Sequence, residues 1–100
     1  MQEFTQRVIE IITSIPRGKV LSYGKVALLA GNPKGARQVA RILHSSSQKY
    51  DLPWHRVVNS QGRISLPEPH NKEQRILLEK EGVVINKNGA IDKELYFWQV

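Results

Sequence analysis

The 100-residue sequence predicts a mainly α-helical domain with a small β hairpin. Three observations support this fold class. Apolar residues recur at helical spacing in several segments, glycine or proline stands at the ends of those segments, and two short extended runs in the second half are joined by a turn. About 40% of the residues are apolar, which is enough for one small core, so we expect a single domain over residues 1–100.

Two helices are predicted at the start of the chain. Residues 3–15 carry apolar side chains at helical spacing, and Pro16 with Gly18 ends the run. After a short extended stretch, the Ser22 side chain can cap a second helix that continues to Ala30. Both helices present one apolar face to a common core.

A third predicted helix has an apolar side and a basic side. Asn32 is a favourable N-cap residue and Pro33 suits the first helical position, while the serines at 45–47 are expected to fray the end. The apolar stripe consists of Ala36, Val39, Ala40 and Leu43. The basic side consists of Lys34, Arg37, Arg41 and His44. The second and third helices therefore read as a helix-turn-helix.

The second half is predicted to contain the hairpin and one more helix. Residues 54–59 and 63–66 form a strand and a return strand around a turn. Asn71 can cap a helix over residues 72–81, and residues 83–91 form a final hairpin or extended tail. Helix, turn, basic helix and hairpin in this order are typical of a winged helix-turn-helix.

The net charge of +6 lies entirely in the first half of the chain. Residues 1–50 hold eight lysines and arginines against Glu3 and Glu10, whereas residues 51–100 hold seven charges of each sign. This asymmetry favours a face that binds a polyanion, although solvated surface lysines would give the same count. The third helix also begins with small residues, which let backbone N–H groups approach a phosphate.

Several classes of function are disfavoured by composition. None of the residues is cysteine, so we expect neither disulfides nor thiolate metal sites, which suits a cytoplasmic protein, nucleoid-associated if bacterial. The N-terminal segment has no signal-peptide pattern, and no run approaches the ~20 apolar residues of a membrane span. The three histidines lack metal-ligand spacing and no cofactor fingerprint occurs, so we expect no metal and no cofactor.

The segment Pro53-Trp54-His55-Arg56-Val57 resembles the Pro-Cys-His-Arg-Val motif of the O6-alkylguanine-DNA alkyltransferases, whose cysteine accepts the alkyl group. Further matching blocks lie at residues 15–20, 22–24, 31–34 with Arg37, 77–78 and 81–82. The resemblance covers roughly residues 4–85. Because Trp54 stands at the cysteine position, the chain is most similar to the alkyltransferase-like proteins, a non-catalytic branch that binds O6-alkylguanine DNA and flags it for nucleotide excision repair.

The resemblance implies a fold like the alkyltransferase C-terminal domain and a site without catalysis. Alkyl transfer needs a strong nucleophile such as a thiolate, and indole is a poor one, so we expect no enzymatic activity. Tyr23 and Arg37 match the base-flipping residues. The residues implied for the alkylguanine pocket are Trp54, Tyr23, Val57, Leu66 and Pro67. The family's loop over the pocket is replaced here by residues 66–70, which implies a wider site.

The resemblance also implies the partners. Double-stranded DNA containing O6-alkylguanine would enter by its minor groove, and a monomer would present it to nucleotide excision repair proteins. The residues implied for backbone contact are Ser22, Lys34, Gly35, Ala36 and Ser60. His55 and Glu81 are expected to form a buried structural pair. Two alternatives remain open: a winged-helix regulator that reads undamaged DNA, and a hydrolase or glycosylase that uses His55.

Overall fold

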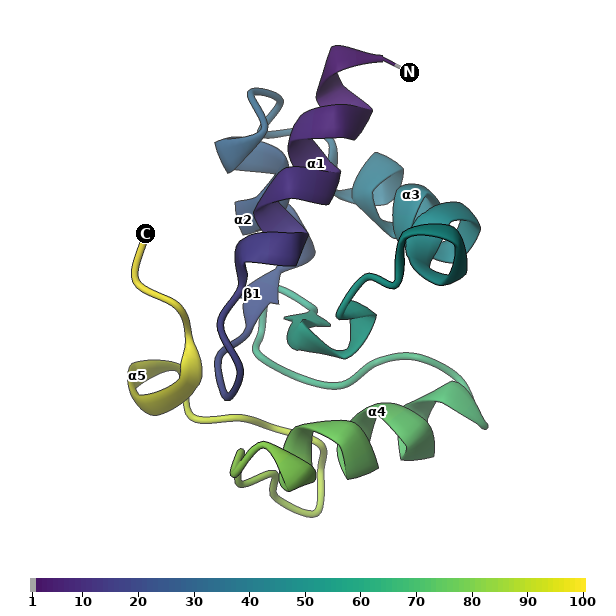
Figure 1. Cartoon of the computed structure of the whole chain (residues 1–100). Helices are drawn as coiled ribbons and strands as arrows, with labels where there is room; N and C mark the ends of the chain where they lie inside the picture. Colours follow the sequence, from purple (N-terminus) through teal and green to yellow (C-terminus); the bar gives the residue numbers. More distant parts are fainter. Residues whose placement is uncertain (1) are drawn as a thin grey trace.

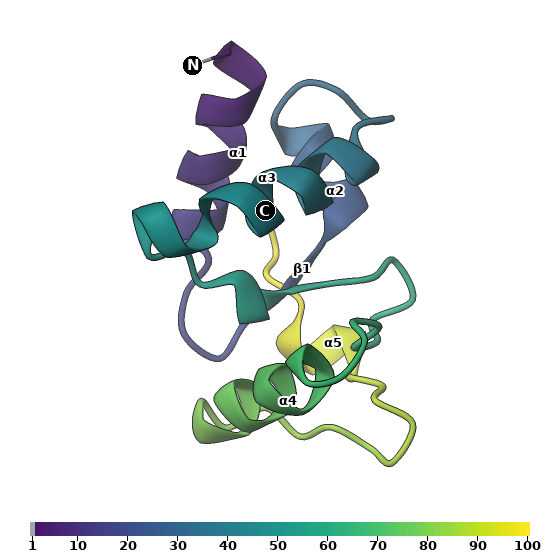
Figure 2. The same ribbon diagram turned by 90° about the vertical axis from the view of Figure 1, so that its right-hand side faces the viewer.

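The computed structural model describes residues 2–100, and it confirms a mainly helical fold with a small sheet (Figure 1). The elements are α1 (Glu3–Ser14), β1 (Leu21–Ser22), α2 (Tyr23–Leu29), α3 (Ala36–Tyr50), the 3-10 turn η1 (Trp54–Arg56), β2 (Val57–Val58), α4 (His70–Lys80) and α5 (Lys93–Tyr96). Helices α1 to α3 form one layer, and α4 with α5 forms a second layer below it (Figures 1 and 2). No helix within residues 2–100 is long and apolar enough to cross a membrane.

The two-stranded sheet separates two hydrophobic clusters. β1 pairs with β2 in parallel, with Leu21 opposite Val57 and Ser22 opposite Val58. Since side chains alternate along a strand, Val57 packs into the cluster of α1 to α3 and Val58 packs into the cluster of α4 and the C-terminal segment. The sheet is therefore a short wall shared by both layers.

The predicted hairpin of residues 54–59 and 63–66 is wrong. Residues 54–56 form a 3-10 turn because Arg56 N donates to Pro53 O, and the strand that follows pairs with β1 instead of with residues 63–66. The final hairpin is confirmed, since Ile85 and Ile91 pair as antiparallel partners. The fold class holds, but the hairpin lies later in the chain.

Two predicted helix starts move. Asn32 caps a turn and not α3: its Oδ1 accepts from Lys34 N, Gly35 N donates to its carbonyl, and the helix begins at Ala36. α3 also continues through the serines to Tyr50. α4 begins at His70, with Pro69 in place of Asn71 at the N-cap. At both helices the asparagine that the sequence favours as N-cap is not used, because the preceding turn places another residue, Gly35 or Pro69, at the N-cap position.

The Ser22 cap is confirmed, since its Oγ accepts from Lys25 N at 3.0 Å. The sequence analysis did not predict α5, a single turn capped by Asp92. This turn brings the C-terminal segment against Val20, which donates its N–H to Tyr96 O and accepts from Trp98 N. The end of the chain thus lies against both clusters.

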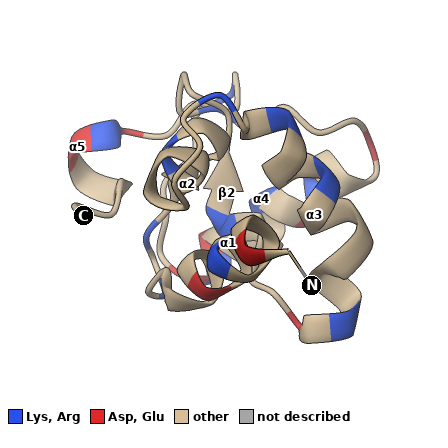
Figure 3. Cartoon of the chain, turned by 90° about the horizontal axis from the view of Figure 1, so that it is seen from above, with Lys and Arg blue, Asp and Glu red and all other residues tan. Residues whose placement is uncertain are grey.

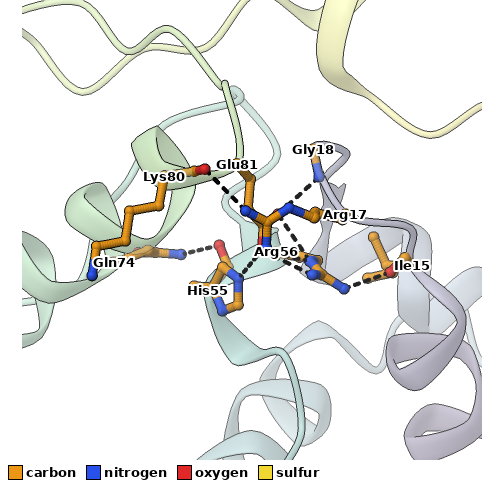
Figure 4. Close-up of polar contacts among 8 residues, drawn as sticks. All are labelled: Ile15, Arg17, Gly18, His55, Arg56, Gln74, Lys80 and Glu81. Carbon is orange, nitrogen blue, oxygen red and sulfur yellow. Dashed lines mark hydrogen bonds and ion pairs between the residues drawn. The ribbon is translucent and has the colours of Figure 1, made fainter.

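A buried carboxylate links the two layers (Figure 4). Glu81, at the end of α4, accepts hydrogen bonds from Arg56 NH2 at 2.8 Å, from His55 Nε2 at 2.7 Å and from Gly18 N at 2.8 Å. Its side chain is only 5% exposed. Arg56 also donates to Ile15 O at 2.8 Å, at the end of α1. The carboxylate therefore joins the end of α4, η1 and the loop after α1.

The hydrogen bonds keep Glu81 ionised. Burial alone would raise the pKa of this carboxyl, but the bonds from Arg56, the Gly18 amide and His55 outweigh it and lower the pKa from 4.5 to about 2. A carboxylate only accepts, so the shared hydrogen of the His55 pair sits on Nε2. Gln74 supports the same turn, because its Nε2 donates to His55 O and Val57 O.

We predict that Glu81 contributes stability above about pH 4.5 that is lost as the pH falls toward 2, because its pKa is lower in the folded than in the unfolded chain. Glu81→Gln leaves Arg56 without its partner and should cost about 3 kcal/mol at pH 7. Urea unfolding between pH 7 and pH 3 should show a flatter pH dependence for this variant than for the unaltered chain. The exposed neighbour variant Glu79→Gln is the control; identical slopes for all three proteins would contradict the prediction.

Candidate functional site

A cavity of about 570 Å³ opens between α3, η1 and the start of α4. Its lining residues come from α2, α3, η1, α4 and the loops before η1 and α4: Tyr23, Ala40, Leu43, His44, Ser47, Gln48, Asp51, Leu52, Trp54, Leu66, His70 and Glu73. Leu43, Leu52 and Trp54 supply an apolar wall, and polar side chains surround it. An apolar pocket with a few polar groups at its edge is the usual form of a site for a small flat ligand.

Trp54 forms one wall of the cavity at the start of η1. Its ring stands edge-on to His55, with centroids 6.2 Å apart, and edge-on to His70, with centroids 6.3 Å apart. Glu81 and Gln74 both hydrogen-bond His55, so they order the backbone of η1 on the side away from the cavity and thereby position the Trp54 indole. A large, rigid aromatic surface at this point can stack against a planar base or pack against an alkyl chain.

Tyr23 lies across the cavity as the first residue of α2. The Ser22 cap orders the backbone of this helix start, from which the half-buried Tyr23 side chain lines the cavity. Burial raises the pKa of the Tyr23 hydroxyl, which therefore stays protonated at neutral pH. A neutral phenol at this position can donate a hydrogen bond and adds no negative charge near a phosphate.

The exposed basic face of α3 borders the cavity. Arg37, Arg41 and His44 are exposed and follow one another at intervals of four and three residues, which places them on one helix face. Ala40 lies between them and lines the cavity together with His44. Figure 3 shows Lys and Arg recurring along α3. A polyanion bound along this face would pass directly over the opening.

The turn before α3 and the loop after β2 lie on the same side of the molecule (Figure 2). Lys34 in the turn and Ser60 in the loop are exposed, and Ala36 is half-buried at the helix start. The first N–H groups of a helix have no partner within it, so this end of α3 is suited to a phosphate. Lys34, Ser60 and Ala36 stay predicted backbone contacts, and none of the three is buried.

Four of the residues expected from the sequence lie elsewhere. Val57 is fully buried in the core and does not line the cavity. Pro67 is exposed on the loop before α4 and is not among the residues that line the cavity. Ser22 is buried and its hydroxyl caps α2. Gly35 is buried too, and its N–H bonds Asn32 O. Val57, Ser22 and Gly35 therefore support the site from within, whereas Pro67 stands on the surface of the loop.

Gly35 lies close to α1 and to its own turn. A Cβ at this position would lie 2.9 Å from Cζ of Phe4 and 3.1 Å from Asn32 O, so a larger residue here would make the Phe4 ring and the turn shift. His55 and Glu81 lie together as expected, in the network behind Trp54. The sequence analysis missed the part that Arg56 and Gln74 play in that network. Both are polar residues within predicted elements, Arg56 in the strand and Gln74 in the helix, and nothing in their spacing distinguishes them.

The lining residues that the sequence analysis missed come mainly from α3 and α4. His44, Gln48 and Glu73 line the cavity although they lie in two helices far apart in the chain, and His70, the last residue of the predicted pocket loop, lines it as the first residue of α4. The helical period of α3 places His44 and Gln48 on one face, which is the only signal that could have found them. The contribution of α4 depends on the tertiary fold.

The family model described as "6-O-methylguanine DNA methyltransferase, DNA binding domain" matches residues 3–83. The DNA base-flipping protein of Escherichia coli (strain K12) is 48% identical over 95 residues, which cover 95% of this chain and 74% of that protein. Alkyltransferase-like protein 1 of Schizosaccharomyces pombe (strain 972) is 38% identical over 105 residues, covering 99% and 97%.

Solved structures agree with the sequence relatives. S. pombe Atl1 in complex with damaged DNA containing O6-carboxymethylguanine superimposes with a TM-score of 0.89 at 35% identity, covering 100% of this chain and 98% of that one. The O6-methylguanine methyltransferase of Mycobacterium tuberculosis gives a TM-score of 0.66 at 31% identity, covering 81% of this chain and 49% of that one. The chain therefore belongs to the alkyltransferase-like, DNA base-flipping proteins of the 6-O-methylguanine DNA methyltransferase family.

Proposed function

We propose that this chain is a non-enzymatic sensor of DNA damage that binds O6-alkylguanine in duplex DNA through the minor groove and flips the base into the cavity. The observation that carries the proposal is the open cavity of about 570 Å³, walled by Trp54 and bordered by the exposed basic face of α3. The complex of S. pombe Atl1 with DNA containing O6-carboxymethylguanine supports the same ligand class.

Arg37 and Tyr23 supply what flipping requires. Extruding a base costs a few kcal/mol of lost stacking and pairing, and less for a guanine that already pairs badly. Arg37 is exposed on the first turn of α3, one turn before Ala40 at the cavity. Its planar guanidinium fills the gap in the stack and hydrogen-bonds the orphaned partner base. Tyr23 crowds the phosphate of the lesion, so the nucleotide rotates outward.

The cavity then holds the extruded base. Stacking of a base on an aromatic side chain contributes about 1–3 kcal/mol, enough to offset the cost of flipping when combined with backbone contacts. Trp54 provides that stacking surface, and Leu66 closes the side toward the loop. Lys34, Ser60 and the first N–H groups of α3 at Ala36 contact the backbone, so affinity falls as salt rises.

In this proposal no alkyl group is transferred after the lesion is bound. None of the 100 residues is cysteine, and Trp54 offers no nucleophile to an alkyl group. The His55–Glu81 pair, which could activate a neighbouring thiol, serves here to fix η1. We propose that a monomer of the chain marks the lesion and hands the DNA to nucleotide excision repair proteins.

The proposed function first predicts a preference for damaged over undamaged DNA. A duplex with one O6-methylguanine should bind more tightly than the identical unmodified duplex, because only the damaged base combines easy extrusion with a stable bound position. Fluorescence anisotropy with both duplexes measures this difference. Mass spectrometry after prolonged incubation should find the lesion and the protein mass unchanged. Equal affinities would refute the sensor, and a methyl gain on the protein or loss of the alkyl group from the DNA would refute the absence of catalysis.

The second prediction separates flipping from general attraction to phosphate. Arg37→Ala should lower affinity for the damaged duplex by about tenfold or more, the loss of one stacking and hydrogen-bonding contact, while affecting the unmodified duplex less. Lys34→Ala removes one phosphate contact and should weaken both duplexes by the same factor. Parallel titrations measure the two ratios. Equal losses for the two variants on both duplexes would show that Arg37 only holds a phosphate.

A further inference from the structure

Two loops of the chain have the same backbone structure. The first covers residues 59–63, with the sequence Asn-Ser-Gln-Gly-Arg, and the second covers residues 86–90, with the sequence Asn-Lys-Asn-Gly-Ala. Each has asparagine first and glycine fourth. The first follows β2, and the second forms the tip of the hairpin after α4, so the likeness arises in unrelated parts of the chain.

The hydrogen bonds of the two loops correspond one by one. Asn59 Oδ1 accepts from the amides two and four residues later, at 3.0 and 2.9 Å. Asn86 Oδ1 accepts from the equivalent amides, both at 2.9 Å. In each loop the glycine donates its N–H to the asparagine carbonyl and has a left-handed backbone, with φ of 76° at Gly62 and 78° at Gly89. Both tips are therefore ordered by their own asparagine.

The loops also hold each other. Ile64 N donates to Gly89 O at 3.0 Å, and Ile91 N donates to Gly62 O at 2.9 Å. Arg63 and Ala90 pair as antiparallel partners between these bonds. The reciprocal bonds relate the loops by an approximate twofold axis. The second residue of each loop, Ser60 in one and Lys87 in the other, is exposed at its tip.

Both tips lie on the side where DNA is proposed to bind. In Figure 2 the turn before α3, the loop after β2 and the tip of the hairpin all point to the right. The 86–90 loop therefore continues the line of expected backbone contacts beyond Ser60.

The lysine at the second tip is available for an anion. Within residues 2–100 the Lys87 ammonium makes no ion pair or hydrogen bond, and the side chain is exposed. Of the neighbouring cations, Lys93 Nζ donates to Ser60 O and Arg75 donates to Asn86 O, whereas the exposed Arg63 side chain of the first loop, like Lys87, makes no such bond within residues 2–100. These bonds brace both loops from α5 and α4. Lys87 is thus a free positive charge at a fixed position.

We propose that the 86–90 loop is a second DNA-backbone-binding loop, with Lys87 contacting a phosphate further along the duplex than the one reached by Ser60. The proposal rests on the proposed function for the nature of the polyanion. Because the loop lies away from the cavity, the contact adds affinity for any duplex and does not distinguish damaged from undamaged DNA. It lengthens the stretch of duplex that the chain covers.

The test is Lys87→Ala, with Lys80→Ala as the matched control at the exposed end of α4. Loss of one phosphate contact should weaken binding by about five- to tenfold at 0.1 M salt, and the slope of log K against log salt should flatten by about 0.9. The loss should be the same for an O6-methylguanine duplex and an unmodified one, and Lys87→Arg should restore it. Lys80→Ala should leave both quantities unchanged.

Two outcomes would overturn the proposal: an affinity and a salt slope of Lys87→Ala equal to those of the unaltered chain, or an equal loss in Lys80→Ala. Failure of the proposed function looks different. In that case the unaltered chain would bind damaged and undamaged duplexes equally, while the effect of Lys87→Ala on both would still report whether the loop contacts DNA.

Discussion

The carboxylate of Glu81 is the contact on which the arrangement of the site depends. It joins the end of α4 to η1 through His55 and Arg56, and to the loop after α1 through Gly18. Trp54 begins η1, so the wall of the cavity is held by a group that never touches the ligand. A carboxylate with a pKa of about 2 keeps this connection charged, and therefore intact, over the whole physiological range.

In the proposed function, this connection explains how the chain recognises a lesion without repairing it. A histidine bonded to a carboxylate could activate a thiol, but the residue beside it is Trp54, and the same bonds then serve to position an aromatic surface. The basic face of α3 approaches the cavity from the other side through Ala40 and His44. In the proposed function, the cavity, its fixed wall and its basic border together hold the extruded base, and no thiol stands beside His55.

Much of this fold could be predicted from sequence because it depends on local patterns. The 3.6-residue period located the helices and the basic face of α3, and the Ser22 cap followed from residue type. The pairing of β1 with β2 could not be predicted, since two-residue strands are placed by the packing of the layers around them. The resemblance of its motif predicts Val57 as a pocket residue, but alternation along β2 turns its side chain into the core. His70 reaches the cavity only through the placement of α4.

The central claim is that the damaged base leaves the duplex and comes to lie against Trp54. The chain has two tryptophans, so the variant Trp98→Phe leaves Trp54 as the only indole emitter. The account predicts that a duplex with O6-methylguanine quenches this emission at saturation, because a flipped guanine lies in contact with the ring, and that an unmodified duplex quenches it far less. Saturated binding of the damaged duplex with unchanged Trp54 emission, or equal quenching by both duplexes, would contradict it.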